Sequence, residues 1–219
     1  MGVLREVTAL AVSRVIEDPC GVEIFTSWRT WDDTRPALAA LLSAETVDVL
    51  DRAAAAAIRW HGPQQRPTGV PYLEHLLEAL EVLVRGAGVT DPHVLAAVLL
   101  HDVVEDTATT LGDIEREFGP VVAELVDWVT KPPVDGQGRT AKRAAKTTYL
   151  RRLREAPQPA IQVKLADRAS NVQRLFQMPP DFQRRYYAET VTYLLPLAAG
   201  EPFFGPWYDS WRREFAHLA

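Results

Sequence analysis

From residue 43 onward, apolar and polar residues follow the spacing typical of helices. Ser43 is a suitable N-cap for an alanine-rich helix, and the run from Thr110 to Asp113 has the form of a capping box. We predict helices over residues 44–60, 72–85, 92–106, 111–118, 121–130, 141–155, 160–176 and 182–198. Because these segments follow one another with short interruptions, the pattern predicts an all-α helical bundle.

Glycine and proline mark the loops between these predicted helices. The segment from His61 to Pro71 is interrupted by Gly62-Pro63, Pro67 and Gly69, and residues 131–140 are also rich in proline and glycine. Both segments are therefore predicted to be loops.

The first 42 residues form a predicted N-terminal extension with a different pattern. Residues 7–16 and 22–28 alternate loosely between apolar and polar positions, and Asp18-Pro19-Cys20-Gly21 between them is a type I turn signature. This pattern predicts a β-hairpin. A helix over residues 3–15 is the alternative, because short mixed runs are ambiguous by periodicity.

The last 19 residues, 201–219, form a predicted aromatic tail. Trp207, Trp211 and Phe215 follow one another in steps of four, which places them on one face of a short helix. We expect this face to dock onto the bundle rather than to bind a partner. The predicted organisation is thus an extension over 1–42, a helical domain over 43–200 and the docked tail.

Composition narrows the range of functions. The 219 residues carry a formal net charge of −5, which argues against a surface that follows a nucleic-acid backbone. The lone Cys20 excludes an internal disulfide, and Arg5 and Glu6 interrupt any signal peptide. The longest apolar run, residues 94–100, is far below the roughly 20 residues that span a bilayer. We expect a cytoplasmic protein with no membrane contact.

Ionisable residues gather where the apolar segment 94–100 ends. His101-Asp102 follows it directly, and Glu105-Asp106 comes three residues later. Charged groups at the end of a buried helix are costly unless a partner compensates them, and a metal ion would do so. On a continuous helix Glu105 shares the face of His101, which would place it beside the metal.

A second acidic position supports the interpretation as a metal site. Asp167 lies within the apolar helical stretch 163–171 and also requires a cationic partner. Either His75 or His61 can complete a set of nitrogen and oxygen ligands, and spacing alone does not choose between them.

These residues resemble a known family. The order His75, His101-Asp102, Asp167 is similar to the H…HD…D pattern of the HD phosphohydrolase superfamily. The segments 69–75, 101–107 and 164–171 resemble the hydrolase domain of RelA/SpoT proteins and of the small alarmone hydrolases, and the likeness runs from about residue 46 to 200.

The resemblance implies roles for individual residues. His75, His101, Asp102 and Asp167 would bind one divalent ion, typically Mn²⁺ in this family, with Fe²⁺ or Zn²⁺ as alternatives, and His61 would have no ligand role. The acidic pair Glu105-Asp106 would be catalytic. The implied substrate-binding residues are Arg66, Thr68, Lys164, Asn171 and Arg174.

The substrate-binding residues depart from the family pattern at two positions. Pro67 stands where the family has the second residue of a basic pair, and Arg174 stands where some relatives have threonine. Between Arg139 and Arg154 there are seven basic residues and no acidic one. This run is either a solvated face or a source of positive potential that attracts a polyanionic nucleotide.

The resemblance implies an enzyme that hydrolyses the 3′-pyrophosphate of guanosine tetra- or pentaphosphate, (p)ppGpp, to GDP or GTP and pyrophosphate. Because no synthetase domain fits in the remaining length, we expect degradation only, with a small alarmone synthetase as a functional partner. The alternatives are an HD phosphohydrolase for another nucleotide, such as an adenosine alarmone or NADPH, and an inactive module that binds a nucleotide or a protein. The sequence does not predict an oligomeric state.

Overall fold

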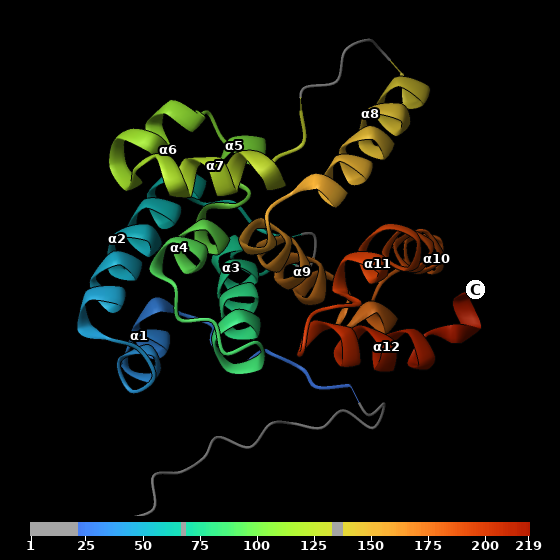
Figure 1. Cartoon of the computed structure of the whole chain (residues 1–219), viewed down its shortest axis with the longest axis horizontal. Helices are drawn as coiled ribbons and strands as arrows, with labels where there is room; N and C mark the ends of the chain where they lie inside the picture. Colours follow the sequence, from blue (N-terminus) through green and yellow to red (C-terminus); the bar gives the residue numbers. More distant parts are fainter. Residues whose placement is uncertain (1–21, 67–68, 133–137) are drawn as a thin grey trace, which may run out of the picture.

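The computed structural model describes residues 22–66, 69–132 and 138–219, and these residues form a helical bundle without strands (Figure 1). The predicted all-α class is confirmed. The α-helices are α1 (Trp31–Ala39), α2 (Ala44–His61), α3 (Tyr72–Glu81), α4 (Pro92–Leu100), α5 (Val103–Asp106), α6 (Leu111–Phe118), α7 (Pro120–Val129), α8 (Arg139–Arg152), α9 (Gln158–Val172), α10 (Pro180–Glu189), α11 (Leu195–Ala198) and α12 (Phe204–Glu214). Short 3₁₀ or π segments extend several of them, namely Val82–Gly86, Leu153–Glu155, Leu175–Gln177, Thr190–Leu194 and Ala216–Leu218.

Helix α4 lies at the centre of the bundle. Every residue from Val94 to Leu100 is buried, and the helix contacts α2, α3, α7 and α9. An apolar sequence on all faces suits this position, because the helix has neighbours on all sides. The packing also brings the C-terminal end of α4 close to α3 and α9.

The prediction of one continuous helix over residues 92–106 is wrong. Helix α4 ends at Leu100, and α5 begins at Val103 after a turn at His101-Asp102. At this turn the ring nitrogen Nδ1 of His101 lies 2.8 Å from the carbonyl oxygen of Val98, and Asp102 has φ −103° and ψ −5°. The helix is therefore interrupted where its polar side chains turn into the protein.

Part of the predicted N-terminal hairpin lies within the described residues, and the hairpin itself stays a prediction. Residues 7–16 and the turn lie outside the described residues, and residues 22–28 form no named strand, although Glu23 takes part in a β-bridge. Side chains at α3 and at the end of α9 bind the backbone of this segment: Phe25 N–H donates to Gln173 (2.8 Å), Gln173 donates to Phe25 O (3.0 Å), and Ser27 N–H donates to Glu81 (2.8 Å). The backbone groups are thus satisfied by α3 and the end of α9.

Helix α12 packs with its aromatic residues against α9. Trp211 is fully buried and donates from Nε1 to the carbonyl oxygen of Val172 at 2.9 Å, and the Tyr208 hydroxyl donates to the carbonyl oxygen of Leu165 at 2.7 Å. These contacts support α9 along the stretch that carries Asp167.

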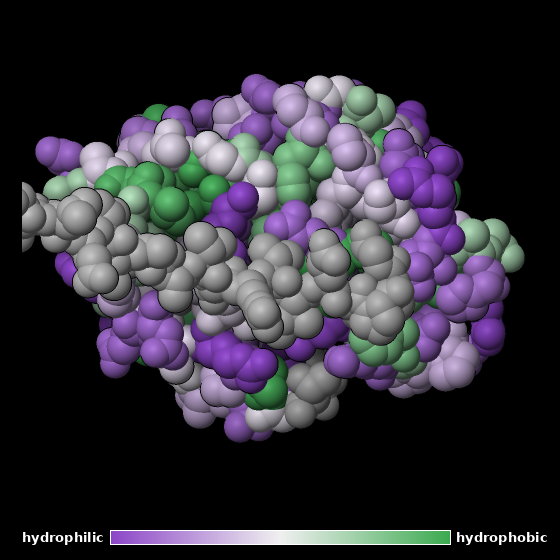
Figure 2. All heavy atoms as spheres, turned by 90° about the horizontal axis from the view of Figure 1, so that it is seen from below, coloured by the Kyte–Doolittle hydropathy of each residue, from purple (hydrophilic) through white to green (hydrophobic). Residues whose placement is uncertain are grey.

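The surface carries few large exposed apolar side chains. Figure 2 shows one face on which hydrophilic residues predominate, with smaller hydrophobic areas between them. Among the described residues, the large exposed hydrophobic side chains belong to separate elements: Leu41, Ile58, Val121 and Phe176. In the described part of the chain, no helix combines the length and apolar character needed to span a membrane.

Candidate metal centre and adjoining pocket

Four predicted metal ligands meet at one point inside the bundle. His75 comes from α3, His101 and Asp102 from the turn after α4, and Asp167 from α9, and one ligand atom of each lies within 4.8 Å of all the others. His101 Nε2 lies 3.0 Å from Asp102 Oδ2, and His75 Nε2 lies 3.4 Å from Asp167 Oδ1. Ligands held about 2.1 Å from one ion lie about 3.0–3.4 Å from each other, so the spacing suits a shared cation.

Both histidines are oriented by their second ring nitrogen. His101 Nδ1 faces the carbonyl oxygen of Val98 at 2.8 Å, and His75 Nδ1 lies 2.9 Å from Ser170 Oγ. Each ring therefore directs its Nε2 toward the cluster. Hydrogen bonds of this kind at the far nitrogen fix the tautomer and the direction of metal-binding imidazoles.

The electrostatics of the cluster also suit a cation. Burial works against every charged form here, yet His101 holds the pKa of Asp102 well below its usual value. Burial likewise opposes the charged form of His101, but Asp102 and Asp167 raise the pKa of that imidazole well above its usual value. The two buried carboxylates thus create a negative potential, which a divalent cation can balance.

Neighbouring side chains hold the two carboxylates in place. Asp167 Oδ2 accepts a hydrogen bond from Lys164 Nζ at 2.7 Å, and Asp167 Oδ1 accepts one from Asn171 Nδ2 at 2.6 Å. Asp102 accepts a hydrogen bond from the Tyr72 hydroxyl. Lys164 and Asn171, both predicted to bind substrate, therefore contact a candidate metal ligand in this structure. Tyr72 was not singled out by the sequence.

Glu105 and Asp106 line a cavity beside the cluster. This cavity of about 190 Å³ is also lined by Asp102 and Asp167. Glu105 accepts hydrogen bonds from the Lys131 amide (2.7 Å) and from Lys131 Nζ (2.6 Å). Despite the interruption after α4, the acidic pair thus lies at the wall of the same cavity as the candidate ligands.

Several cations on the cavity wall were not predicted as site residues. Lys131 and Arg168 line it, together with Lys146 from the basic run in α8. Lys146 Nζ lies 2.5 Å from a carboxylate oxygen of Glu189, and Arg168 contacts the other oxygen of Glu189. The basic run was visible in the sequence, but no sequence signal indicated that Lys146 is the residue of this run that lies at the cavity.

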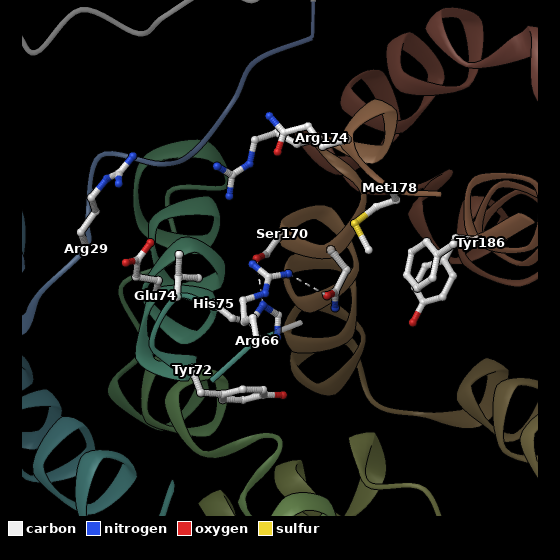
Figure 3. A pocket seen from close by; sticks show the side chains of 13 residues that line it. Arg29, Arg66, Tyr72, Glu74, His75, Ser170, Arg174, Met178 and Tyr186 are labelled. Carbon is white, nitrogen blue, oxygen red and sulfur yellow. Dashed lines mark hydrogen bonds between the residues drawn. The ribbon is translucent and has the colours of Figure 1, made fainter. Parts of the chain in front are cut away.

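A larger pocket of about 390 Å³ adjoins the cluster (Figure 3). It shares four lining residues with the smaller cavity: Tyr72, His75, Asn171 and Tyr186. Its remaining lining includes three arginines, Arg29, Arg66 and Arg174, from three different parts of the chain. A pocket with this charge and an aromatic wall suits an anionic ligand with a ring system.

Arg66 is placed by a tight turn before α3. The Gly69 amide donates to the carbonyl oxygen of Arg66 at 2.8 Å, and Gly69 has a φ of 85°, a conformation that favours glycine. The Arg66 guanidinium donates to Asn171 Oδ1 at 3.3 Å (Figure 3) and to Glu78 at 3.2 Å. Arg174 also contacts Glu78, whereas Thr68 lies outside the described residues.

His61 is not part of the cluster of four. Its ring stacks on Tyr72 with centroids 4.6 Å apart, and its Nδ1 lies 2.8 Å from Gln64 Oε1. The same Gln64 donates to Asp106 at 2.8 Å. Of the two histidines that spacing left open, His75 is the one whose ring nitrogen lies among the other candidate ligands.

A family model for the HD domain matches residues 53–202. This range includes the four residues of the cluster and the helices that line the two cavities. The chain belongs to the HD-domain family. Its relatives place it near the RelA/SpoT members of that family. A GTP pyrophosphokinase of Streptomyces coelicolor is 38% identical over 157 residues, and the GTP pyrophosphokinase rsh of Brucella ovis is 36% identical over 157 residues. These matches cover 72% and 68% of this chain but only 18% and 20% of the relatives, so the chain spans about a fifth of their length.

Two solved structures are similar to this chain. A metazoan ortholog of SpoT, described as hydrolysing ppGpp, superposes with a TM-score of 0.69 at 27% identity, covering 81% of this chain and 98% of the other. A protein of Listeria monocytogenes EGD-e superposes with a TM-score of 0.51 at 25% identity, covering 67% and 96%.

Replacing Asp167 or Asp102 with alanine should remove bound divalent metal, because each supplies one of the two carboxylates of the cluster. Elemental analysis of the purified variants, compared with the unmodified protein, checks this. Asp181→Ala is the control, since that side chain is 90% exposed on α10 and should leave metal content unchanged. An Asp167→Ala protein with its full metal content would show that the ion binds elsewhere.

Proposed function

We propose that this protein is a metal-dependent hydrolase that removes the 3′-pyrophosphate from (p)ppGpp, yielding GDP or GTP and pyrophosphate. The observation that carries the proposal is the junction of two cavities. One is lined by His75, Asp102 and Asp167 of the cluster together with Glu105 and Asp106, and the lining of the other includes three arginines. The HD-domain match and the similarity to a SpoT ortholog that hydrolyses ppGpp support a hydrolase.

His75, His101, Asp102 and Asp167 are the proposed ligands of one divalent ion. When bound, such an ion makes a water molecule acidic enough to attack near neutral pH and polarises a phosphoryl oxygen. Two imidazoles and two carboxylates suit Mn²⁺ or Fe²⁺, while Zn²⁺ also accepts this donor set. We propose Mn²⁺ as the metal.

Glu105 and Asp106 are the proposed catalytic residues. Both carboxylates reach the cavity of the metal cluster from the short helix α5. Glu105 orients the attacking water and accepts its proton, and the two hydrogen bonds from Lys131 hold its carboxylate at the wall. Asp106 lies on the same helix, and its carboxylate accepts a hydrogen bond from Gln64.

The nucleotide is proposed to occupy the arginine-lined pocket, with the 3′-pyrophosphate directed toward the cluster. Arg66 and Arg174 supply positive charge for phosphate groups, and Asn171 lies between Arg66 and Asp167. Lys164, next to Asp167, provides positive charge at the cleaved end. Thr68 is proposed as a further contact from the sequence alone.

A second nucleotide class is the alternative substrate. The chain has Pro67 where the family pattern has a second basic residue, and Arg174 brings a cation to the pocket from α9's end instead. A changed arrangement of cations favours a changed arrangement of phosphates, as in NADPH. An adenosine alarmone, which differs from (p)ppGpp in the base, is the other alternative. A small alarmone synthetase is the functional partner that a (p)ppGpp-degrading activity would fit.

Turnover of a nucleotide panel tests the proposal. With Mn²⁺ present, guanosine tetraphosphate should release pyrophosphate and GDP, and metal removal with a chelator should stop the reaction. The adenosine counterpart and NADPH are assayed in parallel by product chromatography. If the adenosine compound or NADPH is hydrolysed and guanosine tetraphosphate is not, the result selects the alternative substrate. If none of the nucleotides is hydrolysed, the result favours a binding module.

Replacing Glu105 with alanine should separate chemistry from metal binding. The variant should keep its metal, because Glu105 is not one of the four ligands, yet lose about 10²–10⁴-fold in kcat, as expected for a general acid–base residue. Elemental analysis and steady-state kinetics measure the two quantities. Glu124→Ala on α7, outside both cavities, is the control. A variant with unchanged kcat would exclude Glu105 from the mechanism.

Arg66→Ala and Arg174→Ala should each raise KM more than they lower kcat. Both guanidinium groups bind phosphate in the ground state and in the transition state, so their loss acts mainly on KM. Steady-state kinetics of the single and double variants check this, and non-additive effects would indicate a shared phosphate. A fall in kcat at constant KM would contradict the assignment to binding.

A further inference from the structure

Helix α3 carries two buried carboxylates that the proposed chemistry does not use. Glu78 is 3% exposed and Glu81 is 1% exposed. Glu81 faces the N-terminal segment, where it accepts from the Ser27 amide at 2.8 Å and pairs with Arg85 at 2.6 Å. Glu78 instead faces the site. Burying a carboxylate is costly, so its partners indicate what it stabilises.

Glu78 has three partners around the site. Its Oε2 accepts a hydrogen bond from Ser170 Oγ at 2.7 Å and lies 3.2 Å from Arg66 Nη1, while Oε1 contacts Arg174. Arg66 and Arg174 thus both form ion pairs with this one carboxylate. An ionised carboxylate only accepts hydrogen bonds, so the Ser170 hydroxyl must donate its single proton to Glu78.

The direction of this hydrogen bond fixes the state of His75. Because the Ser170 hydroxyl donates its proton to Glu78, Ser170 Oγ acts as a hydrogen-bond acceptor toward His75 Nδ1, which lies 2.9 Å away. Nδ1 must then carry a proton and donate it. In the neutral ring this leaves the lone pair on Nε2, the atom that lies 3.3 Å from His101 Nε2 in the cluster.

We propose that Glu78 is a positioning residue that acts through Ser170 to hold His75 in the tautomer and orientation that bind a divalent cation. This inference rests on the metal site of the proposed function. The same carboxylate anchors Arg66 and Arg174, so one buried charge on α3 organises both a metal ligand and two cations of the nucleotide pocket.

Mn²⁺ binding to the full-length protein without nucleotide tests the inference by isothermal titration calorimetry. Ser170→Ala removes the link between Glu78 and His75 and should weaken Mn²⁺ binding about 10–100-fold, the usual effect of losing such a supporting hydrogen bond. Ser170→Thr retains the hydroxyl and should bind more tightly than Ser170→Ala. Glu78→Gln should also weaken binding, because a neutral amide can donate to Ser170 as well as accept and no longer sets the direction.

Glu81→Gln is the matched control, since it neutralises a buried carboxylate on the same helix without touching the site, and it should bind Mn²⁺ as the unmodified protein does. Wild-type Mn²⁺ affinity in folded Ser170→Ala would overturn the inference, as would an equal loss in Glu81→Gln. Circular dichroism establishes folding, and if Glu78→Gln fails to fold, the two Ser170 variants carry the test. Absence of Mn²⁺ binding in the unmodified protein would instead overturn the proposed metal site itself.

Discussion

Two imidazoles and two carboxylates share a small volume inside an apolar bundle, and this burial constrains much of the surrounding structure. His75, His101 and Asp167 are each at most 5% exposed. Groups of this kind are costly to bury without compensation, so the neighbouring elements supply it. Lys164, Asn171 and Tyr72 donate to the carboxylates, and hydrogen bonds at Nδ1 orient both rings. A divalent cation bound by the four side chains would complete the balance of charge.

Helix α3, the turn between α4 and α5, and helix α9 bring the candidate ligands to one point. The apolar α4 is held on all sides, which fixes the turn at His101-Asp102. Helix α9 is supported from outside by Trp211 and Tyr208, and the extended segment 22–28 is tied to α3 and to the end of α9. Segments beyond the HD-domain match thus support the helices that carry the site.

The site combines regions of opposite potential. The cluster and the Glu105-Asp106 pair are acidic, whereas Arg29, Arg66 and Arg174 line the adjoining pocket. This division suits a polyanionic nucleotide that is held by cations while one of its phosphate groups approaches a bound metal ion. Glu78 lies between the two regions and contacts members of both through Ser170, Arg66 and Arg174.

The sequence by itself determined the helical class, most helix positions and the set of candidate ligands. Helical periodicity and caps are local patterns, and the H…HD…D motif is defined by the order of its residues along the chain. It left His61 and His75 open by spacing, and only packing shows that His75 joins the cluster. It also predicted a continuous helix through His101 and a strand over residues 22–28. The structure breaks the helix at His101-Asp102, where both side chains meet His75 of α3 and Asp167 of α9. It also shows that Gln173 and Glu81 bind the backbone of Phe25 and Ser27. Contacts between residues far apart in the chain, such as Glu78 with Ser170, leave no local pattern, so only the folded structure reveals them.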